Sequence, residues 1–180
     1  MLRGAPTRPP LLPLAPAVTC CSACRLAALV ADPAIDVVVT SNRTAVEWVD
    51  RPGVPTPEDG FAEVWQQLDA AGLPVVVLSG NPLVLPADAT LDCVASGRRD
   101  PSVCARPRDA ALPVDHQIEP ALATSGVTLV DTSGWFCTVG TCPAVVGSLL
   151  VHRDEQHLTT AYARALSPQV WEAVSGVLGR

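Results

Sequence analysis

The sequence predicts an α/β domain in which helices cover both faces of a parallel sheet. Helix-like and strand-like segments alternate three times along the 180 residues, and the strand-like segments are nearly continuous runs of Val, Leu and Ile. Continuous apolar strands are typical of parallel sheets whose two faces are both buried. A chain of 180 residues is long enough for one such domain with a substantial core.

In the first half, breaker residues and side-chain periodicity define the elements. Asp32-Pro33 stops the first helix, because the residue before a proline disfavours helical geometry. Phe61, Trp65 and Leu68 share one face of the second helix, which Gly72 ends. The expected elements are a helix over residues 24–31, a strand over 35–40, a proline-rich loop without regular structure over 50–59, a helix over 61–71 and a strand over 73–78.

In the second half, proline disturbs one helix and a threonine begins another. Pro113 blurs the start of a helix that Pro120 interrupts, whereas Thr159 or Thr160 supplies the N-cap of a later helix. The expected elements are a surface loop between Cys93 and Cys104, a helix over 110–124, a strand over 127–131, a tight loop over 135–142, an apolar segment over 145–151 that is either a strand or an extended packing segment, and helices over 159–166 and 168–178.

Polar residues follow each of the three expected strands. They are Ser41-Asn42, Ser79 to Asn81, and Asp131 to Ser133, and residues 152–159 follow the last sheet-like segment. Ligands of parallel sheets bind beyond the carboxyl ends of the strands. The functional edge of the domain is therefore expected where these four segments meet.

The segment His-Arg-Asp-Glu-Gln-His-Leu-Thr at residues 152–159 contains an acid and a histidine three residues apart, Asp154 and His157. A carboxylate that accepts the Nδ1 hydrogen of an imidazole fixes its tautomer and leaves Nε2 to act as a base. The bland alternative is an ordinary polar turn before the last helices. A third reading, a metal cluster of His152, Asp154 and His157, is weaker because His152 is expected to point away from the turn.

Residues 135–168 resemble the C-terminal end of the SGNH domains that are fused to bacterial membrane O-acyltransferases (acyltransferase 3). The resemblance rests on Trp-Phe-Cys at 135–137, Cys142-Pro143, Arg-Asp-x-x-His-Leu-Thr at 153–159, Tyr162 and Pro168. Earlier blocks occur in the same order, so the resemblance covers roughly residues 20 to 178. They are Cys24-Arg25, the strand at 35–40, the helix with Trp65, the strand at 73–78, the Cys93–Cys104 loop and the segment from Val127 to Cys137.

The resemblance implies the flavodoxin-like three-layer α/β/α fold of SGNH hydrolases. It implies that His157 is a general base oriented by Asp154, in a serine esterase or acyl-transfer site that needs no cofactor and no metal. The implied substrate is an acylated surface polysaccharide or a lipid-linked glycan. The implied location is the extracytoplasmic face of the membrane, next to a membrane acyltransferase domain.

The sequence departs from the family at the nucleophile. Family members carry a Gly-Asp-Ser-His type motif after their first strand, and no such motif occurs among these 180 residues. We therefore expect residues 20–180 to form a partial domain without its first strand, residues 1–19 to be a disordered leader or a misplaced start, and hydrolase activity to be low or absent. Alternatives are a replacement nucleophile at Ser41 or Ser79, and a non-catalytic glycan-binding or interaction module on the same fold.

Asn42 has two readings. It caps or turns the chain after a strand, or its side chain donates a hydrogen bond to an oxyanion, as Asn does in many SGNH enzymes.

The seven cysteines lie in local groups, and close pairs around short loops suit disulfides in an oxidising compartment. The expected pairs are Cys93–Cys104 and Cys137–Cys142. The pairing of Cys20, Cys21 and Cys24 stays open. Alternatives are a zinc site that combines Cys21-x-x-Cys24 with Cys137 and Cys142, and a redox Cys-x-x-Cys.

The net charge of −6 argues against a nucleic-acid partner, because phosphate binding needs a cationic surface. The four tryptophans and His116 are not expected to take part in a functional site. Trp48, Trp65, Trp135 and Trp171 are expected in core or rim packing, and His116 is expected to be solvated.

Overall fold

The computed structural model describes residues 20–44, 46–49, 51–84, 90–96, 100–155 and 157–179, so the expected leader over 1–19 lies outside the described residues. Three parallel strands form the central sheet in the order β1-β2-β4: β1 (Val38–Ser41), β2 (Val75–Leu78) and β4 (Val127–Val130). Val38, Val75 and Val127 lie side by side in this register. The predicted α/β class with a parallel sheet is confirmed.

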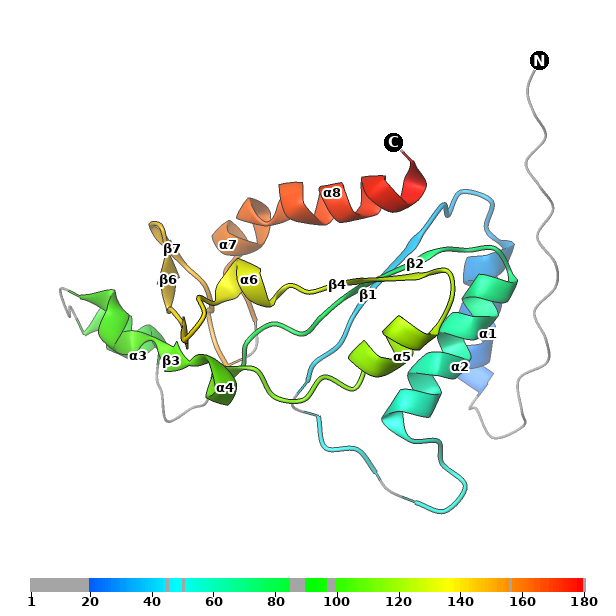
Figure 1. Cartoon of the computed structure of the whole chain (residues 1–180), viewed down its shortest axis with the longest axis horizontal. Coiled ribbons are helices and arrows are strands. Elements are labelled where there is room, and N and C mark those ends of the chain that lie inside the picture. The colour runs from blue at the N-terminus through cyan, green and yellow to red at the C-terminus, as the bar shows by residue number, and fades with distance from the viewer. Residues whose placement is uncertain are drawn as a thin grey trace.

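One face of the sheet is covered by α1 (Cys20–Ala31), α2 (Pro57–Ala70) and α5 (Ile118–Ala123), which lie together on one side of the strands (Figure 1). The core of this layer is apolar and closed. It consists of Leu26, Val30, Trp65, Leu68, Ala71, Leu73, Val75, Val77 and Ala121.

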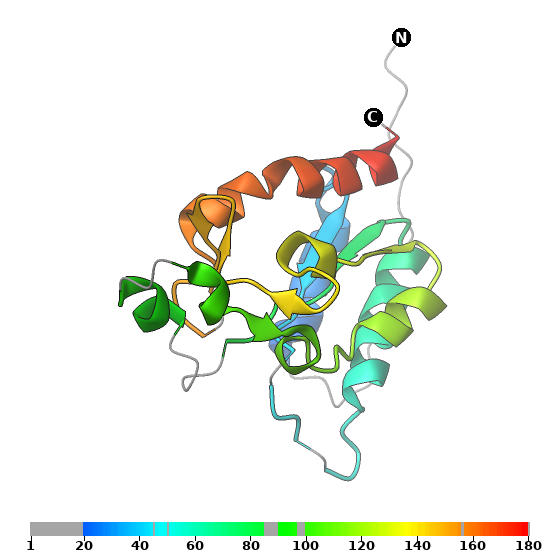
Figure 2. The same ribbon diagram turned by 60° about the vertical axis from the view of Figure 1, so that its left-hand side comes forward.

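The opposite face is covered by α8 (Ser167–Leu178), which follows α7 (Thr160–Ala165) and runs along the other side of the strands (Figures 1 and 2). The α8 helix contacts β2 but has no fully buried residue, and Trp171 on it is 60% exposed. The domain thus has the three layers of an α/β/α fold.

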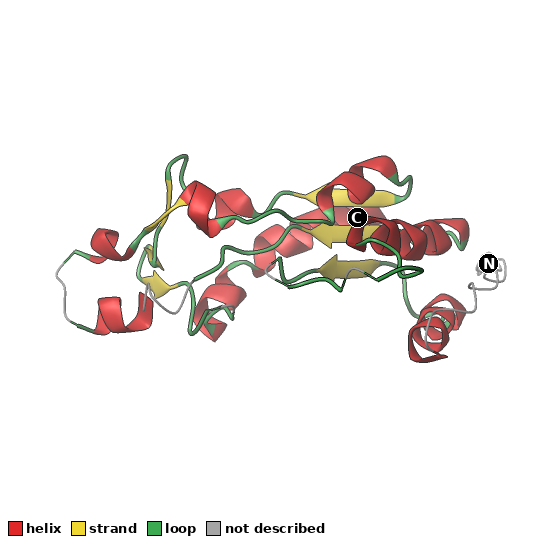
Figure 3. Ribbon diagram, turned by 90° about the horizontal axis from the view of Figure 1, so that it is seen from below, coloured by secondary structure: helices red, strands yellow, loops and turns green. Residues whose placement is uncertain are grey.

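Short elements gather beyond the carboxyl ends of the strands, to which the strand arrows point (Figure 3). We call the described residues between 90 and 111 and between 133 and 158 the cross-linked lobe. Its elements are α3 (Thr90–Ala95), the 3₁₀ helix η2 (Pro101–Cys104), β3 (Arg106–Pro107), α4 (Arg108–Ala111), α6 (Ser133–Phe136), β5 (Thr141–Cys142), β6 (Val145–Val146) and β7 (Leu149–Leu150). The strands pair antiparallel as β3–β5 and β6–β7.

Both expected disulfides lie in this lobe. Cys93 is joined to Cys104 and Cys137 to Cys142, with Cα–Cα distances of 5.9 and 4.0 Å. The side chains of Cys20, Cys21 and Cys24 lie outside the described part of the structure, so their pairing stays open.

Several expected boundaries are wrong. The α2 helix begins at Pro57, inside the expected 50–59 loop, because Thr56 caps it by accepting a hydrogen bond from the Asp59 amide (3.1 Å) and proline is tolerated in a first turn. The expected helix over 110–124 is two helices, α4 and α5. Pro120 lies in the first turn of α5, where proline is tolerated. The Cys93–Cys104 loop contains helical turns, and residues 145–151 form the β6–β7 hairpin around Gly147 (φ 60°).

The expectation for His116 is also wrong. Its side chain is 30% exposed and Nδ1 pairs with the Glu58 carboxylate, while its ring lies 6.2 Å from that of Trp48. The hydrogen bond from His116 lowers the pKa of Glu58. Of the four tryptophans, Trp65 is a core residue, whereas Trp48 and Trp171 are largely exposed.

No helix in the described ranges is both long and apolar enough to cross a bilayer. Among the same residues, no group of three or more His, Cys, Asp or Glu side chains is arranged to hold a metal ion.

Candidate active site

The turn that carries Asp154 and His157 is closed by backbone hydrogen bonds. His152 and Leu158 form an antiparallel bridge, and the Arg153 amide donates to the His157 carbonyl (2.9 Å). Thr159 then joins the turn to α7, because its Oγ1 accepts from the Tyr162 amide (3.1 Å) and donates to the Leu150 carbonyl (2.5 Å). The turn is thus fixed at both ends.

Within this turn, Asp154 holds the His157 ring. Nδ1 of His157 lies 2.9 Å from both carboxylate oxygens of Asp154, and the His157 amide donates to Oδ1 (2.8 Å). Because a carboxylate only accepts, Nδ1 carries the hydrogen of the neutral ring, and the lone pair of that tautomer is on Nε2. Arg153 also pairs with Asp154, at 3.4 Å between Nε and Oδ2. This is the arrangement that an imidazole base needs.

His157 lines a hollow of about 260 Å³ that we call the catalytic hollow. Its walls come from the ends of two strands and from the turn, so three of the four expected polar segments contribute to it, whereas Asp131 and Ser133 line a separate hollow. The lining residues are Ser41, Asn42, Arg43, Thr44, Asn81, Pro82, Leu83 and His157.

Two asparagines face this hollow. Asn42 follows β1, and its Nδ2 is buried without a hydrogen-bond partner among the described residues. An unpaired buried amide donor is costly, so a group that accepts its hydrogen bond is stabilised there. Asn81 follows β2, and its Nδ2 lies 3.5 Å from Nε2 of His152. The sequence pointed to the segment containing Asn81 but not to this residue as a donor.

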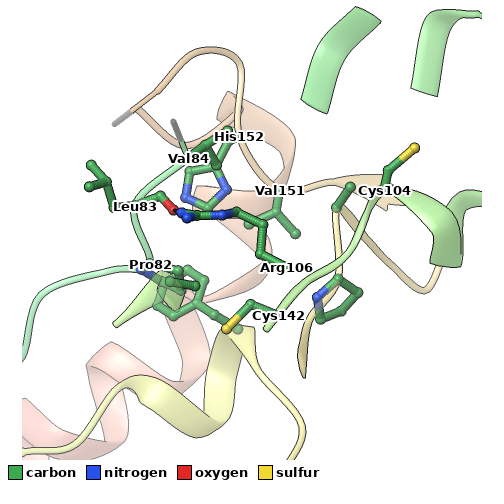
Figure 4. Close-up of a pocket in the computed structure, with 12 residues that line it drawn as sticks. Pro82, Leu83, Val84, Cys104, Arg106, Cys142, Val151 and His152 are labelled. Atoms are coloured by element: carbon green, nitrogen blue, oxygen red, sulfur yellow. Dashed lines mark hydrogen bonds between the residues drawn. The ribbon is translucent and has the colours of Figure 1, made fainter. Parts of the chain in front are cut away.

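The segment from Asn81 to Val84 is tied to the cross-linked lobe. The Val84 amide donates to the Glu155 carbonyl (3.0 Å), which links this segment directly to the turn that contains His157. Arg106, which is 9% exposed, donates to the Leu83 carbonyl. In Figure 4 the Arg106 side chain extends toward Leu83 beside the His152 ring. These contacts fix Asn81 relative to His157.

His152 differs sharply from His157. It is 4% exposed, and burial lowers its pKa from 6.5 to about 4, although a hydrogen bond to the Pro82 backbone and the charge of Asp154 act in the opposite direction. A neutral His152 can accept the hydrogen bond of Asn81 through Nε2. His152 is therefore a supporting residue for the hollow.

Of the two serines considered as replacement nucleophiles, the structure excludes Ser79. Its Oγ accepts a hydrogen bond from the Thr132 amide (2.9 Å) and lies 3.1 Å from the Thr132 hydroxyl, and the residue is buried. Ser41 is exposed and lines the catalytic hollow with His157. No hydrogen bond joins Ser41 to His157 in the described residues.

Gly80 brings the chain close to the first strand. Its amide donates to Asp115 Oδ2 (2.8 Å), and a Cβ at this position would overlap the methyl group of Thr44. A larger residue at this position would require the Thr44 side chain to move aside.

A model of a protein family described as "SGNH domain (fused to AT3 domains)" matches residues 4–172. The chain belongs to this family. Membership confirms the family and the fold that the sequence suggested, and it places the SGNH domain among hydrolase and acyltransferase-associated domains whose relatives are fused to AT3 domains. Neither the curated proteins nor the solved structures give a significant match to this chain.

The structure of the SGNH domain places three residues that the sequence singled out around one hollow. Asp154 and His157 form a hydrogen-bonded pair, and Asn42 lines the hollow that His157 faces. The sequence did not predict that His152 and Arg106 hold the segment after β2 in place. No local pattern shows that these two residues are buried against it.

Proposed function

We propose that this SGNH domain supplies the base and an oxyanion donor of a site that cleaves or transfers acyl esters. The observation that carries the proposal is the Asp154–His157 pair, whose Nδ1 contact with both carboxylate oxygens at 2.9 Å leaves Nε2 of the neutral ring as the basic nitrogen. Asn42 lines the same hollow as His157.

In the proposed step, Nε2 of His157 takes the proton of a hydroxyl as its oxygen attacks the ester carbonyl. The carbonyl oxygen becomes an oxyanion, which Asn42 Nδ2 stabilises by donating a hydrogen bond. As the tetrahedral intermediate collapses, the imidazolium returns its proton to the leaving alkoxide. Asp154 stabilises the imidazolium throughout.

The proposed substrate is an O-acylated glycan of the cell surface, either a polysaccharide or a lipid-linked precursor. Family relatives are fused to AT3 domains, which supports a membrane acyltransferase as the physical partner. Two disulfides support an oxidising, extracytoplasmic environment, because cytosolic thiols are kept reduced.

The 180 residues contain no Gly-Asp-Ser-His motif that would supply the attacking hydroxyl. We therefore expect that this chain by itself hydrolyses p-nitrophenyl acetate no faster than its His157→Ala variant, and that a fluorophosphonate labels no serine. Labelling of Ser41 that disappears in His157→Ala would contradict this expectation and identify Ser41 as the nucleophile.

The role of the base is tested by fusing a Gly-Asp-Ser-His block from a family member ahead of residue 20. The fusion should hydrolyse the ester, and His157→Ala or Asp154→Asn should reduce kcat by about 100-fold or more, because a positioned base contributes that much. His116→Gln is the control, since His116 pairs with Glu58 away from the hollow. Activity that persists without His157 would refute the assignment.

A glycan-binding module is the second candidate, favoured by a hollow of about 450 Å³ on the other side of Asn81. Its lining includes Arg108, Asp115 and Asp131, whose charged groups suit a hydroxyl-rich ligand. Hydrogen bonds from Ser133 lower the pKa of Asp131, so it is an anionic acceptor at neutral pH. Glycan binding by an inactive fusion would support this candidate over the esterase.

A further inference from the structure

A third and larger hollow, of about 790 Å³, lies against the end of β1. We call it the aromatic hollow. Its walls come from β1, from the loop before α2 and from α2 itself. The lining residues are Thr40, Ser41, Glu47, Trp48, Val49, Val54, Pro55, Thr56, Pro57, Gly60, Phe61, Val64, Trp65 and Gln117.

The aromatic rings in this hollow form a continuous wall. Phe61 stacks on Trp65 with ring centroids 5.4 Å apart, and Trp48 meets the edge of Phe61 at 6.1 Å. Exposed valines continue the wall, since Val49 is 59% and Val64 40% exposed. The size lies within the 300–1,000 Å³ range of ligand pockets, and the mainly apolar lining is typical of them.

The polar side chains are a minority of the lining, and two of them are already engaged. Thr56 caps α2, and the Gln117 amide group donates to Asp115 (3.2 Å). Thr40 Oγ1 is buried and has no hydrogen-bond partner among the described residues. The Ser41 hydroxyl and the Glu47 carboxylate also line the hollow. A sugar ring needs several convergent donors and acceptors, so this lining fits a hydrocarbon better than a glycan.

The aromatic hollow adjoins the catalytic hollow. Ser41 lines both, so the two spaces are neighbours at the end of β1. Two other residues, Thr44 and Asn81, line both the catalytic hollow and the hollow with Arg108 and Asp131. An ester whose carbonyl occupies the catalytic hollow would thus have an apolar space on one side and a charged space on the other.

We propose that the aromatic hollow binds the hydrocarbon chain of the acyl group, so that the domain prefers esters with acyl chains longer than acetyl. The inference rests on the proposed ester site, because the shared lining residue Ser41 sets the direction of the chain. Trp48, Phe61 and Val64 enclose the methylene groups, and the buried Thr40 hydroxyl is one of the few polar groups of the lining.

The test compares binding of 6-O-octanoyl-glucose, 6-O-acetyl-glucose and glucose to the chain, followed by calorimetry and by tryptophan fluorescence. Each buried methylene strengthens binding by about fourfold. Burial of only three of them gives the octanoyl ester an affinity about 60-fold above that of the acetyl ester. Equal affinities for the two esters would overturn the proposal.

Two variants locate the binding. Val64→Asp places a charge in the hollow and should weaken octanoyl binding by tenfold or more, whereas Val139→Asp should not, because Val139 is 98% exposed and lies in the cross-linked lobe. Trp48→Ala, on the opposite wall, should weaken binding as well, which covers the case in which Val64→Asp fails to fold. Octanoyl binding that both wall variants leave unchanged would refute the site.

Sedimentation distinguishes a ligand pocket from a protein interface. Self-association of the chain that Val64→Asp or Trp48→Ala abolishes would show that a second copy covers the hollow, and would overturn the acyl-chain assignment. His157→Ala separates this proposal from the ester-cleaving one, because octanoyl binding should survive that change. If the chain binds the octanoyl ester but the fusion shows no activity that depends on His157, the acyl pocket is supported and the role of His157 as a base is refuted.

Discussion

The sheet region and the cross-linked lobe are held together by different interactions. Under the sheet, Trp65, Leu68 and Leu73 are at most 2% exposed and belong to one continuous apolar core. In the lobe, the strands are two residues long, and the buried cluster that joins Phe136 to Tyr162 of α7 is much smaller. Two disulfides and side-chain bonds to backbone carbonyls, such as that from Arg106 to Leu83, supply the remaining order.

The catalytic hollow lies where these two regions meet. Asn42 comes from the end of β1, whereas Asp154 and His157 come from the lobe. Stability therefore depends mainly on the sheet, and the geometry of the base depends mainly on the lobe. The two properties should respond to different mutations.

The largest effect is expected in the sheet core. Leu68→Ala should lower the free energy of unfolding by about 2–5 kcal/mol, because it leaves a cavity under α2 where the leucine is 1% exposed. Urea denaturation measures the change. Val139→Ala, at a position that is 98% exposed, should change it by less than about 0.5 kcal/mol. An equal loss of unfolding free energy in the two variants would contradict the view that stability depends mainly on the sheet.

The next effect is a pH dependence that originates in the lobe. The pKa of His152 is about 4 in the folded chain against 6.5 ordinarily. Between these values the unfolded chain binds a proton that the folded chain does not, so stability should fall by up to about 3 kcal/mol as the pH drops from 6.5 to 4. Denaturation at a series of pH values checks this.

His152→Gln should remove this component of the pH dependence, because glutamine does not titrate. His157→Gln should keep it, since the His157 side chain is 64% exposed. If His152→Gln leaves the pH dependence of the unfolding free energy unchanged, the lowered pKa of His152 is wrong.

The smallest effect on stability is expected from the short disulfide. Replacing Cys137 and Cys142 together with serine opens a loop with a sequence separation of 5 and should cost about 2 kcal/mol. Hydrogen exchange should quicken in α6 and in the turn at 152–158, while the amides of β2 stay protected. Loss of protection in β2 to the same degree would show that the two regions unfold as one unit.

The sheet was largely predictable because its signal is local. The β-branched runs place β1, β2 and β4 within three residues of their observed bounds, and the strand ends bring the expected polar segments to one edge. The start of α2 was missed because the prolines before Phe61 were interpreted as a loop, although Thr56-Pro57 is a favourable helix start.

The lobe was predictable only where cysteines or a helix cap marked it. Thr159 or Thr160 was predicted as the N-cap of α7, and the cap is Thr159. The burial of His152 depends on Asn81, Pro82 and Arg106, which are distant in sequence, so its local context could not show it. The same holds for the aromatic hollow, because Trp48 and Val64 meet only when the loop before α2 folds back against β1.

Gly80 bears on how this domain could be altered by directed evolution. A Cβ there would overlap the Thr44 methyl group, so a saturation library at position 80 should be enriched in glycine and in small residues that Thr44 accommodates by turning its side chain. Trp48, Val49 and Val64 are exposed wall positions and should accept many residues. Selection for a new acyl preference should therefore accumulate changes on the α2 side of the molecule and leave the chain that leads from β2 to the base unchanged.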